Sequence, residues 1–105
     1  MVTKAELKML IKEGYSKGYN FQKTLSTANV AERITSQEID IAIMLLKAKA
    51  GNGGKIYVGF DEVLTSSNGM ELEASGWISI PIDRADKVFV LTDNATDGVC
   101  VICLV

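Results

Sequence analysis

The sequence ends in DGVCVICLV, which holds both cysteines of the 105-residue chain, Cys100 and Cys103. The spacing C-x-x-C is that of redox-active dithiols and of half a zinc site. In a strand, however, residues i and i+3 point to opposite faces and lie about 10 Å apart, beyond the roughly 7 Å that a disulfide spans. We therefore interpret both cysteines as small apolar side chains of a buried strand.

The chain contains no histidine. This excludes Ser-His-Asp and Cys-His nucleophiles within one chain, as well as histidine-based zinc sites and pH switches. Glu71 and Glu73 share one face of a predicted strand, where two carboxylates could act as general acid and base. The alternating pattern explains them more simply as the solvent side of a half-buried strand, which could also recognise a basic partner.

Two loops resemble ligand-binding motifs. The glycine-rich residues 51–55 follow a predicted helix instead of preceding one, which predicts a helix end and a turn, not a phosphate loop. Residues 93–98, DNATDG, match the first half of a calcium loop, but Leu104 stands where a bidentate Glu is needed. We interpret this stretch as a polar hairpin turn and predict neither a metal nor a cofactor.

A basic stripe marks the N-terminus, with aromatic residues close behind it. The residues concerned are Lys4, Lys8, Lys12, Lys17, Tyr15 and Tyr19. Basic and aromatic side chains together can bind nucleic acid through phosphate contacts and base stacking. A pI of about 5.0 opposes this, and the alternative is a solvated helix face.

Charge divides the chain into two halves. Residues 1–55 hold nine Lys/Arg and five Asp/Glu, a balance of +4, whereas residues 56–105 hold two and eight, a balance of −6. The halves also differ in periodicity, since the first carries helical spacing and the second alternates.

The first half predicts helices. Thr3 and Glu6 form a capping box, and apolar residues repeat at helical spacing after it. Thr35 and Glu38 form a second box, which predicts a helix over 36–50 that is apolar around most of its circumference. A short helix is expected between them, around residues 21–28.

The second half predicts strands. Alternating apolar residues indicate strands at 56–60, 70–74, 78–82, 87–92 and 99–105. Asn68-Gly69 predicts a type I′ turn between the first two, and Pro81 indicates a strand at a sheet edge. The last two strands are expected to pair as a hairpin around residues 93–98.

These elements predict one α+β domain over residues 1–105, with a helical half at about 1–50 and a strand half at about 55–105. The N-terminal helices would pack in a second layer on a four- to five-stranded antiparallel sheet, a meander of hairpins. The other sheet face would carry Glu71, Glu73, Ser79 and either Trp77 or Tyr57. Strand 99–105 is apolar on both faces, so whatever covers its second face would be a partner if this chain does not supply it.

We expect a small non-enzymatic binding or regulatory protein that acts through protein–protein interaction as a homodimer, such as a phage or mobile-element accessory or inhibitor protein. The reason to expect a homodimer is the predicted helix 36–50, whose apolar surface would have to be buried against a partner. A nucleic-acid or nucleotide binder using the basic N-terminal helix and a small-molecule enzyme with a carboxylate site on the sheet are the alternatives. The candidate binding residues are Lys4, Lys8, Lys12, Lys17, Tyr15, Tyr19, Glu71, Glu73 and Trp77.

The same sequence predicts a cytoplasmic location, in a cell or an infected host. No apolar run approaches the roughly 18 residues of a membrane span, and the N-terminus lacks the pattern of a signal peptide.

Overall fold

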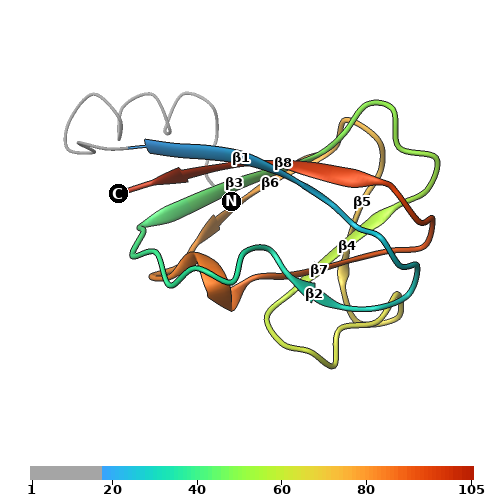
Figure 1. Ribbon diagram of the computed structural model, residues 1–105, viewed down its shortest axis with the longest axis horizontal. Coiled ribbons are helices and arrows are strands. Elements are labelled where there is room, and N and C mark those ends of the chain that lie inside the picture. The colour runs from blue at the N-terminus through green and yellow to red at the C-terminus, as the bar shows by residue number, and fades with distance from the viewer. Residues whose placement is uncertain (1–17) are drawn as a thin grey trace.

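A computed structural model describes residues 18–105, which form eight strands in two facing sheets (Figure 1). One short 3₁₀ helix, η1 (Ala85–Lys87), connects the sixth and seventh strands. The strands are β1 (Gly18–Thr24), β2 (Glu32–Arg33), β3 (Ile43–Ala48), β4 (Ile56–Gly59), β5 (Met70–Leu72), β6 (Trp77–Pro81), β7 (Phe89–Thr92) and β8 (Gly98–Leu104).

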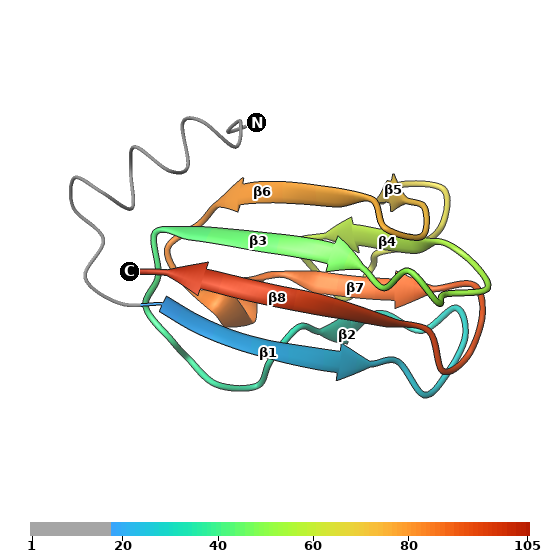
Figure 2. The same cartoon turned by 90° about the horizontal axis from the view of Figure 1, so that it is seen from above.

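The strands pair antiparallel in the orders β1-β8-β3-β6 and β2-β7-β4-β5 (Figure 2). We refer to these as the β8 sheet and the β7 sheet. Most connections cross from one sheet to the other, and among the described strands only β4 and β5 are both consecutive and paired. Eight strands in these two orders have the connectivity of a jelly roll.

The main core lies between the sheets and is built from alternate residues of each strand. Met44, Leu46 and Ala48 of β3 point inward and are fully buried, as are the alternating residues of β8. Ile56, Val58 and Val90 face them from the β7 sheet. Burying each such aliphatic side chain contributes about 1.5–3 kcal/mol, which makes this layer the main source of stability.

A second, smaller cluster covers the outer face of the β7 sheet. The loop of residues 60–69 folds back so that Leu64 packs on Tyr57, Phe89 and Leu91. Gly69 allows this approach, because a Cβ there would lie 2.6 Å from Leu64 Cδ1 and 2.9 Å from Tyr57 Cβ. The chain therefore supplies its own cover for one of its two outer sheet faces.

The predicted α+β fold is wrong, because the described residues form two β-sheets and no α-helix. The predicted helix 36–50 contains β3 instead, and residues 36–42 are largely irregular. The apolar residues of β3 suit a strand. Met44 and Leu46 point into the core, while Leu45 points outward and has the neighbouring strands beside it. A continuous apolar run cannot be assigned to helix or strand by periodicity alone.

The second capping box has a different role. Thr35 Oγ1 accepts a hydrogen bond from the amide of Gln37 at 3.2 Å, which closes a short turn. Glu38 pairs with Arg84 at 3.5 Å instead of reaching back to Thr35. Thr35 and Glu38 thus stabilise a turn and an ion pair rather than a helix start.

The remaining helix predictions also change. The short helix expected around 21–28 is wrong, since residues 18–24 form β1 and pair with β8 along its length. The first predicted helix, with its box of Thr3 and Glu6, lies outside the described residues.

The strands predicted for the second half are confirmed as β4 to β8, but two of the connections predicted between them are wrong. Neither Asn68 nor Gly69 has a positive φ, so the β4–β5 hairpin closes through a longer loop and not a type I′ turn. The last two strands do not pair, because β7 and β8 belong to different sheets. Pro81 does lie on an edge strand, β6.

The prediction of a sheet face that exposes Glu71, Glu73, Ser79 and either Trp77 or Tyr57 is also partly wrong. Glu71 and Glu73 are exposed, but Tyr57 and Ser79 are only 6% and 5% exposed. Tyr57 is buried under the loop of residues 60–69. Among the described residues, no helix is long and apolar enough to cross a membrane.

We predict that Leu64→Ala lowers the free energy of unfolding by about 2–3 kcal/mol, the lower part of the range for buried leucines, because the cavity opens near the surface. Urea denaturation measures this. Val63→Ala is the matched control: Val63 is 66% exposed and should change stability by less than about 0.5 kcal/mol. Equal effects of the two substitutions would contradict the packing of Leu64 described above.

Candidate functional site

The outer face of the β8 sheet carries apolar side chains where a jelly roll normally meets solvent or a partner. Alternation along β8 turns Cys100 and Ile102 outward, while Val99, Val101 and Cys103 fill the core. Cross-strand register places Leu45 beside Ile102, and Lys47 between Cys100 and Trp77. These five residues, Leu45, Lys47, Trp77, Cys100 and Ile102, are called the β8 face below.

The β8 face is hollowed by a shallow cavity of about 510 Å³ that all five residues line. Ile102 is 45% exposed, and Leu45, Trp77 and Cys100 are half-buried. The end of the sheet nearest Gly18 is covered, since Ile43 and Leu104 are buried. The middle of this sheet is therefore the open part.

The two cysteines lie on opposite faces of β8, as the sequence interpretation requires. Cys103 points into the core, is fully buried and unpaired, and burial raises the pKa of its thiol to about 11. Cys100 is also unpaired but half-buried on the β8 face. The interpretation as a buried apolar residue is confirmed for Cys103, whereas Cys100 belongs to a surface.

A second apolar surface lies on the β4–β5 hairpin. Phe60, Val63 and Met70 are 62%, 66% and 58% exposed, and all three line one open cavity of about 500 Å³. Figure 1 shows the loop that carries Phe60 and Val63 below the β7 sheet, on the side away from the β8 sheet. We call the cavity lined by Phe60, Val63 and Met70 the hairpin groove.

The glycine-rich loop binds an anion, but that anion is the protein's own carboxylate. The amides of Gly53 and Gly54 donate to Asp97 at 2.9 and 2.7 Å, and Asn94 Nδ2 donates at 3.1 Å. Burial by itself raises the pKa of Asp97, but these hydrogen bonds outweigh it and hold the pKa below its usual value. The loop is the predicted turn, although it follows a strand and not a helix.

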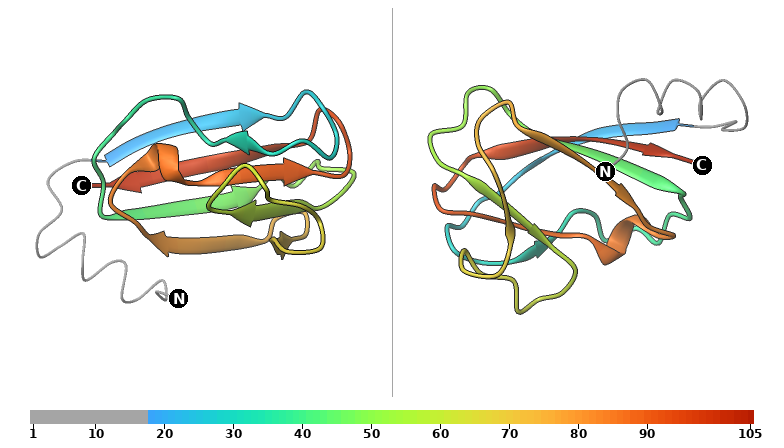
Figure 3. Two further views of the ribbon diagram at one scale, coloured as in Figure 1. Left: turned by 90° about the horizontal axis from the view of Figure 1, so that it is seen from below. Right: turned by 180° about the vertical axis from the view of Figure 1, so that it is seen from behind.

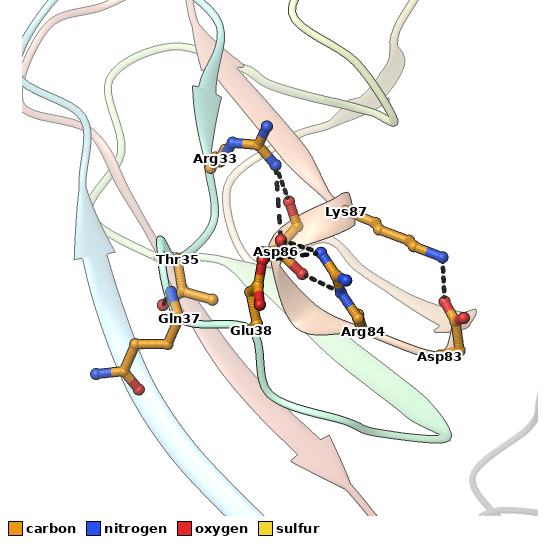
Figure 4. Close-up of polar contacts among 8 residues, drawn as sticks. All are labelled: Arg33, Thr35, Gln37, Glu38, Asp83, Arg84, Asp86 and Lys87. Atoms are coloured by element: carbon orange, nitrogen blue, oxygen red, sulfur yellow. Dashed lines mark hydrogen bonds and ion pairs between the residues drawn. The ribbon is translucent and has the colours of Figure 1, made fainter.

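A chain of ion pairs surrounds η1 (Figure 4). Arg84 donates to both carboxylate oxygens of the buried Asp86, at 2.9 and 2.7 Å, and these bonds lower the pKa of Asp86. Arg33 donates to the Asp86 carbonyl at 2.7 Å, and Lys87 pairs with Asp83. Because each cation has a carboxylate partner, the cluster fixes the turn between β6 and β7 and offers no free group for chemistry.

The predicted site residues that the structure describes are not brought together. Lys4, Lys8, Lys12, Tyr15 and Lys17 lie outside the described residues. Tyr19 is on the edge strand β1, 39% exposed and turned toward the inner side of the β8 sheet. Glu71 and Glu73 lie at the β5 edge of the other sheet, where Lys55 pairs with Glu71 at 3.2 Å. Of the four predicted residues within 18–105, Trp77 alone lies on the β8 face.

Sequence reasoning missed the hairpin groove. The predicted strand 56–60 includes Phe60, but β4 ends at Gly59 and Phe60 begins the loop. The available signal was the run FDEVL, in which acidic residues separate apolar ones without a helical or alternating period.

Metal chemistry finds no support in the described part of the chain, where no group of three or more His, Cys, Asp or Glu is placed to hold an ion. Comparison with protein-family models, with curated proteins and with solved structures finds no match to this chain. A functional proposal therefore rests on the geometry of the β8 face and the hairpin groove.

We predict that Asp97→Asn lowers the free energy of unfolding by about 1–3 kcal/mol at neutral pH, because a charged acceptor of two amides is lost. The folded-state pKa of Asp97 is lowered, so its carboxylate stabilises the fold above about pH 4, and this is lost as pH falls through the folded-state pKa. Urea denaturation at neutral pH and near pH 3 should show a smaller pH dependence in the variant.

The exposed Glu62→Gln is the matched control for Asp97→Asn and should leave both measurements unchanged. If Asp97→Asn were as stable as the parent at neutral pH, the carboxylate would not be the anion that organises the loop.

Proposed function

We propose that this protein is a non-enzymatic binding protein, and that it pairs with a second copy of itself through the β8 face. The observation that carries the proposal is that β8 is apolar on both sides. Its inward residues are buried by the core of this chain, while Cys100 and Ile102 remain on the outer side among Leu45 and Trp77. Apolar side chains gathered on one surface are typical of interaction sites.

The difference between the outer faces of the two sheets supports the β8 face as the binding surface. The outer face of the β7 sheet is covered by the chain's own loop, through Leu64. Within residues 18–105, no segment covers the middle of the β8 sheet in the same way, as the open cavity there indicates. A partner that covers the β8 face would gain about 25 cal/mol for each Å² of apolar surface removed from water.

A second copy suits this face because the face carries little charge. Lys47 is the one charged residue among the five, and the polar residues beside it on β1 are Asn20, Gln22 and Thr24, all uncharged. A charged partner would therefore find only Lys47 to pair with among these residues, whereas two copies can meet about a twofold axis without strong like-charge repulsion. This replaces the apolar helix 36–50 as the motive for a homodimer.

The enzyme alternative gains no such support. Glu71 and Glu73 are both exposed on the β5 edge, and Glu71 is paired with Lys55. A general acid or base usually needs a site where burial and neighbouring groups perturb its pKa. We therefore keep the binding function as the proposal.

We predict that Ile102→Asp converts a dimer into a monomer, because a carboxylate in the centre of the contact would lose its hydration without an equivalent partner. Size-exclusion chromatography with light scattering, over a range of protein concentrations, measures the mass. Ile102→Thr, which keeps a β-branched side chain suited to a strand, should weaken the dimer by a smaller amount. Val30→Asp is the matched control, since Val30 is 47% exposed elsewhere, and it should leave the mass unchanged.

Labelling of Cys100 with a thiol reagent gives a second readout. In a dimer, Cys100 should react more slowly in the parent than in Ile102→Asp, while the buried Cys103 stays unreactive in both folded proteins. A monomeric parent with rapid labelling would overturn the proposal. A monomeric parent with protected Cys100 would also overturn pairing with a second copy.

A further inference from the structure

The hairpin groove is the second surface on which apolar side chains gather, and it is distinct from the β8 face. Phe60, Val63 and Met70 are the three most exposed large apolar residues of the part of the chain that the structure describes. They lie within one hairpin and line one cavity, so they form a patch and not scattered single residues. Single exposed apolar residues need no explanation, but a contiguous patch does.

The loop that carries Phe60 and Val63 is held in place by its own hydrogen bonds. Asn68 Oδ1 accepts from the amide of Thr65 at 2.7 Å, and Asn68 Nδ2 donates to the carbonyl of Val63 at 3.1 Å. Asp61 Oδ1 accepts from the amide of Val63 at 3.1 Å. Leu64 anchors the same loop in the cluster on the β7 sheet.

This anchoring gives the neighbouring residues Leu64 and Val63 different roles. Leu64 is 6% exposed and holds the loop, whereas Val63 next to it is 66% exposed. The exposed side chains are therefore presented by a fixed backbone. A partner that binds them does not have to order the loop first, and this lowers the entropic cost of association.

The edge strands β5 and β6 lie on the same side of the sandwich (Figure 3), and the groove extends along this side. A second hollow of about 290 Å³ joins Phe60 and Met70 to Ile78, Ile80 and Pro81 of β6. Phe60 and Met70 line both hollows, so the two form one extended apolar surface. An extended surface of this kind fits a peptide segment better than a small compact ligand.

Charge around the groove is predominantly negative. Asp61 lines the groove and Glu62 follows it in the loop, and both are exposed. Glu71 and Glu73 are exposed as well, but alternation along residues 70–73 turns them to the face opposite Met70, where Lys55 pairs with Glu71. Arg33 and Lys87 line a separate hollow with Phe60, Asp61 and Glu62, but they pair with Asp86 and Asp83, so the charge beside Phe60 stays negative.

The geometry points to a peptide-binding site: the hairpin groove takes a basic, amphipathic segment of a partner protein. Its apolar residues pack against Phe60, Val63 and Met70, and its Lys or Arg side chains face Asp61 and Glu62. Packing supplies most of the affinity, and the charges supply orientation and discrimination against acidic segments.

Two labelled helical peptides of about 15 residues test this, each with leucines on one face. One has lysines on the other face and the second has glutamates. Fluorescence anisotropy with the full chain should show binding of the basic peptide and at least about tenfold weaker binding of the acidic one. Raising the salt concentration should reduce the difference.

Substitutions locate the binding. Val63→Ser and Met70→Ser should each weaken binding of the basic peptide by about tenfold, as expected for central apolar contacts. Glu62→Gln tests the charge without touching the apolar patch and should weaken binding at low salt only. Val30→Ser and Ile102→Asp are the controls: the first is an exposed apolar residue elsewhere, and the second alters the β8 face, so both should bind as the parent does.

Three results would overturn the inference: no binding of the basic peptide, equal binding of both peptides, or parent-like binding by Val63→Ser and Met70→Ser. Circular dichroism of each variant shows whether it is folded, and Glu62→Gln remains decisive if a serine variant is not. Because Ile102→Asp separates the two surfaces, failure here leaves the β8 face untouched, and failure of self-pairing leaves the groove untouched.

Discussion

The pairing of β8 between β1 and β3 is the constraint on which the rest of the structure depends. It joins Gly18–Thr24 to Gly98–Leu104, the first and last strands of the described chain, and so closes the sandwich. Because β8 is an inner strand, both of its backbone edges are satisfied within the sheet. Its inward side chains complete the main core, and its outward ones have only their neighbours on β1 and β3 beside them. The apolar character of both faces of β8 therefore links stability to recognition.

The second half of the fold was predictable because its strands alternate. The strand segments of β4 to β8 follow from period-two patterning between turn residues, which is a local signal. The first half was not, because Ile43–Ala48 is apolar at every position except Lys47, and such a run satisfies a helix as well as a strand. Only pairing with β6 and β8, thirty or more residues away in sequence, makes it a strand. The crossing of β7 and β8 between sheets is likewise a property of the whole topology.

The candidate surfaces were predictable to a smaller extent. The sequence predicts that strand 99–105 is apolar on both faces, and the structure places Cys100 and Ile102 on the outer face. The hairpin groove had no comparable signal, because the exposure of Val63 depends on Leu64 being anchored beside it, which is a tertiary contact. The role of Asp97 was hidden for the same reason: its partners, Gly53 and Gly54, are more than forty residues away.

The two surfaces differ in chemistry, and the loop that carries Phe60 and Val63 lies on the side of the β7 sheet away from the β8 sheet. Their combination has a consequence for assembly, because two copies that meet through the β8 face would bury the apolar side chains there and leave the loops with Phe60 and Val63 away from the contact. Each pair would then offer two acidic grooves with a fixed separation. A partner with two basic segments would be held by both at once, and the second contact would form at high effective concentration without any new chemistry. Self-pairing would in this way raise the avidity of a groove whose individual contacts are few.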